Sequence, residues 1–283
     1  IINKKGFTLI ELLAVIAILS IVSAIAYPKI IDVIGASRLT AYNVSKSNIV
    51  DSAKLKYLAD VTSSSSVTEY SIKELIDTGY VKNGAKNPLT NDDFDNDTKV
   101  LITNENGNVN YDFVEGKTIY DYVSNKDEKS NVYRINNELI FKGYVLENYA
   151  IFNGEIYRIM KVDKYRRVYL IKESSKKLYK NELLNYENNF INDNFDENAT
   201  KKIYGKASVI STDLYNQTFI NNISYINMDN NDWIKDNNGY ITIGMNKEIV
   251  NSDYAKTYIT IKLNNNIIVT GGNGTQLNPY VLN

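Results

Sequence analysis

The chain has 283 residues, of which 43% are hydrophobic and 23% are charged, enough for two modest domains with their own cores. Its formal net charge of −1 gives no global field toward nucleic acid or an anionic membrane surface. Cysteine and histidine are absent, which excludes a disulfide framework, thiol or histidine catalysis and the usual zinc sites. We therefore expect no enzyme activity, no catalytic residues, no cofactor and no metal.

The chain begins with a short basic lead followed by an apolar segment. Lys4 and Lys5 precede residues 7–27, and the next charge after that segment is Lys29. The polar side chains inside the segment belong to Thr8, Glu11, Ser20 and Ser23. A helix of this length spans about 30 Å, the thickness of a bilayer's hydrocarbon core. We predict that 7–27 spans a membrane with the N-terminus on the cytoplasmic side.

A secretory signal peptide is the alternative interpretation. Lys4 and Lys5 would form its basic region, 7–19 its apolar region, and Ala-Ile-Ala at 24–26 its cleavage site. Two features oppose it. A carboxylate such as Glu11 costs about 2.5–3.5 kcal/mol inside an apolar segment, and the chain continues as a helix after the supposed cleavage.

Helical periodicity continues beyond Pro28 to about residue 61. Two apolar stripes follow it, one formed by Ile31, Ile34, Tyr42, Ile49, Ala53 and Tyr57, the other by Val33, Val44, Leu55 and Leu58. A helix with two apolar stripes has two surfaces to pack against, its own head and a second partner. Pro28 removes a backbone hydrogen bond, so we expect the helix to bend there.

The octapeptide Gly6-Phe7-Thr8-Leu9-Ile10-Glu11-Leu12-Leu13 resembles the processing site of type IV pilins and pseudopilins, and the long helix with an internal proline is similar to theirs. The resemblance implies that prepilin peptidase cleaves between Gly6 and Phe7, removing residues 1–6 as a leader, and that the Phe7 amine is N-methylated. It assigns assembly roles to Phe7, Glu11 and Pro28. It also implies other pilin subunits and a pilus assembly platform in the membrane as partners.

Cleavage would place a cationic amine one helical turn before Glu11. Two opposite charges about 4 Å apart attract by about 4 kcal/mol at an effective dielectric of 20, comparable with the cost of burying the carboxylate. The amine could belong to the same chain or to the next subunit, and only the second pairing makes a filament. Ser20 departs from the family, in which many relatives carry glycine at that place.

After a polar break at 62–66, we predict a first pilin-like head over 62–116. A short helix over 70–77 has Ser71 as its cap, and strands at 99–103 and 108–114 flank a hairpin turn.

An acidic loop lies within this head. Asp93, Asp95 and Asp97 have the alternate spacing of a calcium loop, but Thr98 and Asn104 stand where an EF-hand needs glycine and glutamate. A solvated acidic loop is the favoured interpretation.

Residues 117–283 predict a second, mostly β, α+β domain. After a connecting helix at 117–125 we expect strands at 132–135, 139–141, 149–152, 155–162, 168–171, 209–210, 241–243, 258–263 and 267–269. We also expect a mixed segment of helix and loops at 176–194, a helix at 213–223 and a polar, asparagine-rich stretch around 228–239. The segments 148–162 and 268–282 resemble a C-terminal module of other Gram-positive prepilin-type proteins.

A basic, tyrosine-containing segment at 161–180 is the one candidate binding surface. Phosphate attraction combined with aromatic rings suits single-stranded nucleic acid and polyanionic cell-wall polymers. The residues we assign to polyanion binding are Lys164, Arg166, Arg167, Lys176 and Lys177. The alternative, which we favour, is the solvated face of a strand and helix.

Together these features predict an α+β protein in which a long N-terminal helix packs on an antiparallel-sheet pilin head, followed by the second domain. The expected function is that of a structural subunit of a type IV pilus, most like a Gram-positive minor pilin that displays a recognition or adhesion domain for a host-cell, cell-wall or DNA ligand. The precursor is expected in the cytoplasmic membrane and the mature protein on an extracellular pilus. The alternative is a pseudopilin of a DNA-uptake or type II secretion-like system with a polyanion-binding head.

Overall fold

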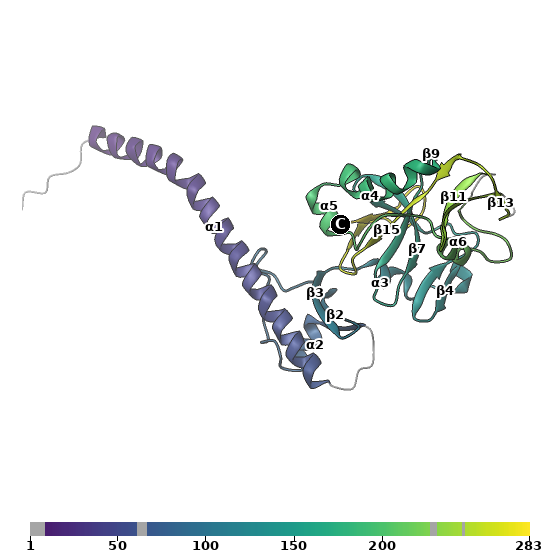
Figure 1. Cartoon of the computed structure of the whole chain (residues 1–283). Coiled ribbons are helices and arrows are strands. Elements are labelled where there is room, and N and C mark those ends of the chain that lie inside the picture. The colour runs from purple at the N-terminus through teal and green to yellow at the C-terminus, as the bar shows by residue number, and fades with distance from the viewer. Residues whose placement is uncertain (1–8, 61–66, 227–230, 245–246) are drawn as a thin grey trace, which may run out of the picture.

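A single long helix dominates the N-terminal part of the structure. The computed structural model describes residues 9–60, 67–226, 231–244 and 247–283. Helix α1 (Leu9–Ala59) runs without interruption through Pro28 and projects from the rest of the chain (Figure 1). Its axis changes direction in the N-terminal half, in keeping with the backbone hydrogen bond that a proline removes.

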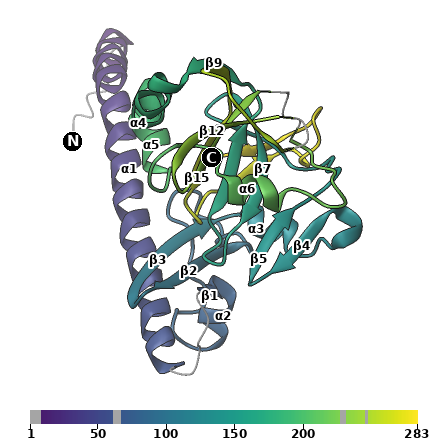
Figure 2. The ribbon, with the colours of Figure 1, turned by 45° about the vertical axis from the view of Figure 1, so that its right-hand side comes forward.

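The C-terminal half of α1 packs on a small sheet. Strands β1 (Val67–Ser71), β2 (Thr98–Glu105) and β3 (Asn108–Glu115) form a three-stranded antiparallel sheet in the order β1-β2-β3. Figure 2 shows β3 beside α1, and Ile49 and Ala53 of the helix are buried in the core that they share with the sheet. This head is held together by the apolar stripe that the periodicity identified.

Local signals account for the shape of the first head. Ser71 caps α2 (Ile72–Asp77), accepting a hydrogen bond at 3.1 Å from the backbone N–H of Glu74. The turn between β2 and β3 places Asn106 at φ 54° and Gly107 at φ 88°, the left-handed conformations that a tight hairpin requires. Both the cap and the hairpin confirm the predictions for this region.

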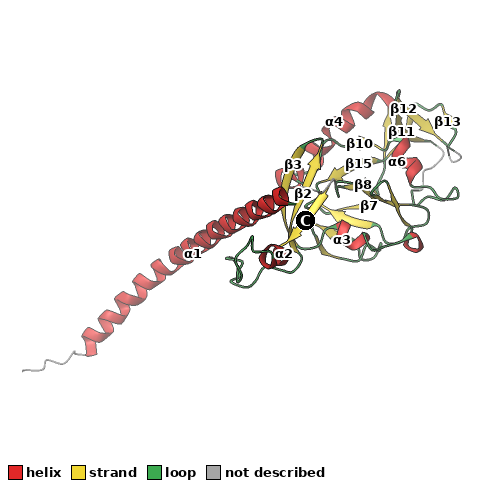
Figure 3. Cartoon of the chain, turned by 90° about the horizontal axis from the view of Figure 1, so that it is seen from below, coloured by secondary structure: helices red, strands yellow, loops and turns green. Residues whose placement is uncertain are grey.

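The second part of the chain is richer in strands (Figure 3). Its helices are α3 (Ile119–Val123), α4 (Leu183–Asn194), α5 (Glu197–Lys201) and α6 (Thr212–Gln217), with 3-10 turns at Glu128–Ser130 and Lys180–Glu182. Its strands are β4 (Val132–Ile135), β5 (Glu138–Phe141), β6 (Tyr149–Phe152), β7 (Glu155–Val162), β8 (Val168–Lys172), β9 (Lys176–Tyr179), β10 (Ser208–Val209), β11 (Asp232–Asp236), β12 (Gly239–Ile243), β13 (Ile249–Val250), β14 (Tyr254–Thr257), β15 (Ile259–Leu263), β16 (Val269–Gly271) and β17 (Tyr280–Leu282).

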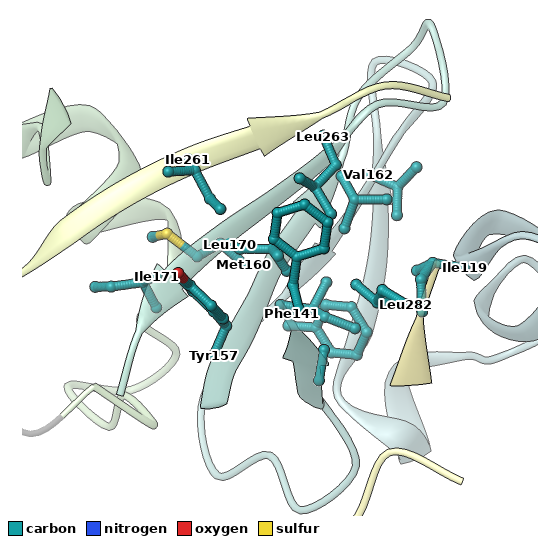
Figure 4. Packing of buried hydrophobic residues seen from close by; sticks show 14 of the residues in the cluster. Ile119, Phe141, Tyr157, Met160, Val162, Leu170, Ile171, Ile261, Leu263 and Leu282 are labelled. Atoms are coloured by element: carbon teal, nitrogen blue, oxygen red, sulfur yellow. The ribbon is translucent and has the colours of Figure 1, made fainter. Parts of the chain in front are cut away.

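Two sheets organise these strands within the described residues. One has nine strands with the main order β10-β15-β8-β7-β6-β17-β16 and with β5 and β4 branching from β7; the other has the order β13-β12-β11-β14-β9. Most pairings are antiparallel, but β17 pairs with β6 and β11 with β14 in parallel. Side chains from β5, β7, β8 and β15 meet in the main core, which Ile119 and Leu282 join from opposite ends of the domain's sequence (Figure 4).

The fold class is confirmed: a long N-terminal helix precedes an antiparallel-sheet head and a mostly β second part. Several elements were not predicted. Strands β13, β14 and β17 fall in segments for which we predicted no strand, and β11 lies in the stretch that we described only as polar and asparagine-rich. Strand β1 overlaps the start of the helix predicted at 70–77, and β9 occupies the start of the segment at 176–194 that we predicted to be mainly helical, so the helical prediction is wrong at both places. Helix α6 ends at Gln217, well before the predicted end at 223.

One buried acid sits at the start of β11. Asp232 is fully buried, near the hydroxyl groups of Tyr215 and Tyr258, and burial raises the pKa of its carboxyl from 3.8 to about 7. Because the pKa of the folded state lies above that of the unfolded chain, the folded protein binds the proton more tightly between these two pH values. The contribution of Asp232 to stability is therefore most favourable below pH 4 and is lost as the pH rises to about 7.

We predict that Asp232→Asn raises the free energy of unfolding at pH 8 by up to roughly 4 kcal/mol and leaves it unchanged near pH 4. Chemical denaturation followed by circular dichroism at the two pH values measures both effects. The matched control is Asp236→Asn, at the partly exposed end of the same strand. An Asp232→Asn effect of equal size at pH 4 and pH 8 would contradict the assignment.

Candidate functional site

The N-terminal half of α1 is an uncovered apolar surface. The described aliphatic side chains from Leu9 to Val22 are all exposed, with Leu9 and Ile10 exposed by about three quarters. Glu11 lies in the first turn, where the free N–H groups of a helix favour a carboxylate. A continuous apolar surface of this extent marks an interaction site, because soluble monomers rarely expose one.

The predicted membrane span at 7–27 is not confirmed. Among the described residues, no helix combines the length and the hydropathy that a membrane crossing needs. The predicted cleavage site between Gly6 and Phe7 lies outside the described residues.

The second apolar stripe of α1 also remains uncovered. Ile49 is 3% exposed against the first head, whereas Val44, on the other side of the helix, is 55% exposed. The remaining uncovered members of the two stripes are Ile31, Ile34, Val33, Leu55 and Leu58. The head thus uses only part of one stripe, and the rest of the helix surface is left for a partner.

A tight turn between β7 and β8 positions the two arginines of the basic segment. The buried Asp163 accepts hydrogen bonds from the backbone N–H groups of Tyr165 and Arg167 at 2.9 and 3.0 Å. Arg166 has φ 64°, a left-handed conformation that costs on the order of 1 kcal/mol for a non-glycine residue. The turn therefore keeps Arg166 in an unfavourable backbone conformation and directs the side chains of both arginines toward the first head.

Both arginines bind carboxylates of the first head. Arg166 contacts Glu69 of β1 at 2.5 Å, and Arg167 contacts Glu105 of β2 at 3.1 Å and Asp163 at 2.8 Å. Although burial acts to lower it, the pKa of Arg167 is raised by its hydrogen bond to Asp163 and by the charge of Glu105. These contacts form a charged junction between the two parts of the chain.

Further contacts extend the same junction. Lys99 of β2 binds Glu69 at 3.1 Å and Asp121 of α3 at 2.6 Å, which links the sheet of the first head to the second part. The buried Asn265 donates a hydrogen bond at 2.8 Å to the hydroxyl of Thr103. Charge-assisted contacts that are partly shielded from water are among the stronger polar interactions in proteins.

The structure divides the predicted polyanion-binding residues into two groups. Arg166 and Arg167 are engaged at the junction, whereas Lys164, Lys176 and Lys177 are exposed. Lys164 precedes β8 and the two other lysines follow it, so they lie beyond opposite ends of that strand. Polyanion binding stays a prediction, but the five residues do not form one continuous basic surface.

The exposed lysines of β9 adjoin an aromatic pair. Tyr179 of β9 and Tyr254 of β14 are about half exposed and have ring centroids 4.6 Å apart across the strand pair. Lys176, Lys177 and Tyr179 therefore share β9, an edge strand of the five-stranded sheet to which no further strand pairs in the described residues. We call these three residues the β9 edge, and the prediction of polyanion binding now depends on them.

The acidic loop of the first head makes local contacts. Asp95 accepts a hydrogen bond at 2.8 Å from the backbone N–H of Asp97, and Asp97 lies 3.7 Å from Lys117. Among the described residues, no group of three or more acidic side chains is arranged to hold a metal ion.

Sequence reasoning missed the junction and Tyr254. Glu69 and Glu105 are single acidic residues in strands, and they lie 97 and 62 positions from the arginines that they bind. No local pattern marks such a pair. The sequence shows that cations outnumber carboxylates within 161–180. It does not show that carboxylates of the first head would pair with these cations.

Comparison with known proteins identifies the N-terminus. Residues 2–27 match the family model of the prokaryotic N-terminal methylation motif. No curated protein and no solved structure matches the chain. The match confirms the resemblance drawn from the octapeptide: the chain starts as type IV pilin-like or pseudopilin-like prepilins do, and a further C-terminal domain follows the first head.

We predict that Glu69→Gln combined with Glu105→Gln loosens the charged junction by roughly 1–3 kcal/mol, because both guanidinium groups lose their partners across it. Hydrogen exchange around 116–118 should accelerate, and small-angle scattering should show a larger radius of gyration.

The matched control is Glu155→Gln, which removes a 3.4 Å contact with Lys172 inside the second part. A junction variant whose exchange and scattering equal those of this control would show that the arginine contacts do not hold the two parts together.

We predict weak binding of single-stranded DNA at the β9 edge. With the two cations Lys176 and Lys177 there, the logarithm of the binding constant should fall with the logarithm of salt concentration with a slope of about −1.4. Lys176→Glu with Lys177→Glu should abolish binding, whereas Lys73→Glu on the first head should not. A slope near −5 would instead require the whole 161–180 segment.

Proposed function

We propose that the protein is a structural subunit of a type IV pilus, a minor pilin that displays residues 117–283 on the filament. The single observation that supports the proposal is that the two halves of α1 are covered to different extents. Its C-terminal half is covered by the first head, while its N-terminal half is apolar and uncovered and carries the methylation motif.

Assembly follows from the chemistry of that uncovered half. Cleavage after Gly6 frees the Phe7 amine, and a neighbouring subunit's amine balances the charge of Glu11 once both are withdrawn from water. The exposed stripe around Val44 then packs on adjacent helices, and the bend at Pro28 shapes the fit. The partners are other pilin subunits, prepilin peptidase and the assembly platform.

Display of the second domain would suit adhesion or recognition at the cell surface. The precursor would sit in the cytoplasmic membrane and the processed subunit in an extracellular pilus. Support comes from the motif and from the charged junction, which fixes the second domain to the head instead of leaving it on a loose linker.

A pseudopilin of a DNA-uptake or secretion system is the second candidate. The observation that favours it is the β9 edge, where exposed lysines adjoin the Tyr179–Tyr254 ring pair. Aromatic rings beside cations are the usual surface for single-stranded nucleic acid.

The first test is mass spectrometry of the N-terminus of the protein purified from its native cells. We expect a chain that starts at N-methylated Phe7, and a chain that keeps residues 1–6 when prepilin peptidase is deleted. A chain that starts at Tyr27 would identify a signal-peptide cut after Ala26 and overturn the proposal.

The second test concerns assembly. We predict that Glu11→Ala lowers the amount of protein in sheared surface filaments at least tenfold while leaving cleavage at Phe7 intact, because the proposed pairing with a neighbouring subunit's amine requires the carboxylate. Immunoblots of sheared and cell-bound fractions measure the ratio. Asp51→Ala, an exposed acid on the same helix, is the control and should assemble normally.

A further inference from the structure

The second domain contains a buried cation that is not balanced by a carboxylate. Arg158 of β7 is 7% exposed. Its guanidinium donates hydrogen bonds to the Asn148 side-chain oxygen at 2.6 Å, the Val145 carbonyl at 2.7 Å and the Tyr149 hydroxyl at 2.8 Å. All three acceptors are neutral, and the described residues form no ion pair with it.

An isolated buried charge is costly, and a folded chain normally pairs it or avoids it. Burial lowers the pKa of Arg158, although nearby Tyr149 and Glu173 act in the opposite direction. A guanidinium carries five N–H donors, and the three hydrogen bonds described above leave two of them for another acceptor. The side chain is thus held in place by neutral groups and retains capacity for an anion.

The same cation lines an open pocket. A pocket of about 450 Å³ is bordered by Arg158, Tyr149, Tyr225, Tyr144, Leu146 and Leu277, within the size range of small-ligand sites. The guanidinium carbon lies 3.9 Å from the ring centre of Tyr149 and 5.0 Å from that of Tyr225. Two aromatic rings therefore lie beside the cation in the lining of the pocket.

A second buried polar group in the pocket has no partner. The Tyr225 side chain is 8% exposed, and its hydroxyl makes no hydrogen bond. Leaving a buried hydroxyl unpaired is unfavourable, and native structures rarely do so without a reason. Arg158 and Tyr225 both belong to the wall of this pocket, so its lining contains an unpaired buried hydroxyl beside a guanidinium with two further N–H groups.

The rim of the pocket is apolar, and local contacts fix the conformation of the loop that forms part of it. Leu277 is 99% exposed, and Leu146 and Tyr144 are exposed by more than half. The loop that presents Leu277 is closed by a hydrogen bond from the Tyr149 N–H to the Gly274 carbonyl at 2.8 Å. A Cβ on Gly274, which has φ 87°, would lie 2.3 Å from the Tyr280 ring, so this loop conformation depends on glycine. The start of the loop that carries Leu277 is therefore held in one conformation.

We propose that this Arg158 pocket binds the free C-terminal carboxylate of a peptide whose last residue is apolar. The planar carboxylate would accept hydrogen bonds from Arg158 and Tyr225. The apolar side chain would cover Tyr144, Leu146 and Leu277. The exposed Gln276 on the rim offers an amide to the peptide backbone.

The pocket fits other anions less well. The hydroxyls of Ser224 and Thr275 in its wall are already hydrogen-bonded, so a polyhydroxylated acidic sugar would find few partners. A phosphate dianion keeps a strongly held water shell, which the aliphatic rim would strip without replacing. The proposal does not require filament assembly, so it can fail or succeed independently of the proposed function.

The test measures fluorescence polarisation of N-terminally labelled tripeptides ending in leucine, each as the free acid and as the amide, with the full-length chain in non-ionic detergent. We expect the acid to bind at least tenfold more tightly than the amide. Equal binding of acid and amide, or no binding of either, would overturn the proposal. Displacement by glucuronate or octanoate at concentrations below the peptide's own would overturn the assignment to a peptide.

Variants separate binding from folding, because Arg158 substitutions can disturb the domain. Leu277→Asp should weaken acid binding at least tenfold without lowering the melting temperature, whereas Ile249→Asp, exposed elsewhere, should change neither. Tyr225→Phe should weaken acid binding several-fold and leave the free protein as stable or more stable, since it removes an unpaired buried hydroxyl. Unchanged acid binding in both Leu277→Asp and Tyr225→Phe would exclude this pocket.

Discussion

A single helix carries more apolar surface than its own chain can bury, and the rest of the structure depends on this imbalance. Along α1, only residues such as Ile49 and Ala53 are covered by the first head, while Val44 and the aliphatic residues from Leu9 to Val22 are not. A three-stranded sheet is too small to cover both sides of a 51-residue helix. The free energy of that uncovered surface favours association, either with lipid or with the helices of other subunits.

The charged junction has a different role, because its contacts restrain the orientation of the large second domain. Two parts of a chain joined at one point move freely unless contacts restrain them. Here Arg166 and Arg167 of the β7–β8 turn form ion pairs with Glu69 and Glu105. Arg166 makes its contact from a strained, left-handed backbone conformation. The same cations that suggested nucleic-acid binding in the linear sequence are therefore used to connect the domains. A basic run is a reliable sign of a binding surface only when its counter-charges are not supplied elsewhere in the chain.

Secondary structure was predictable where local chemistry decides it. The cap at Ser71 and the tight turns at Asn106–Gly107 and Asn153–Gly154 could be recognised because a short side chain or a left-handed backbone is required there. Strand β11 was missed, since Asp232 and Asp236 at its ends resemble loop residues, and only the neighbouring strands β12 and β14 stabilise it. Strand β17 was missed for the same reason: its three residues pair with β6, which lies about 130 positions earlier.

The sequence by itself determined the nature of the N-terminus. A processing motif, a lone carboxylate and a helical period are all local, so they can be read without knowing the fold, and the family match over residues 2–27 agrees with them. Only the tertiary structure decided which charges are free and which are paired, because Arg167 and Glu105 meet through folding alone. It also decided that Arg158 is buried beside the unpaired hydroxyl of Tyr225. Burial and long-range pairing depend on the packing of distant segments, and no window of sequence contains that information.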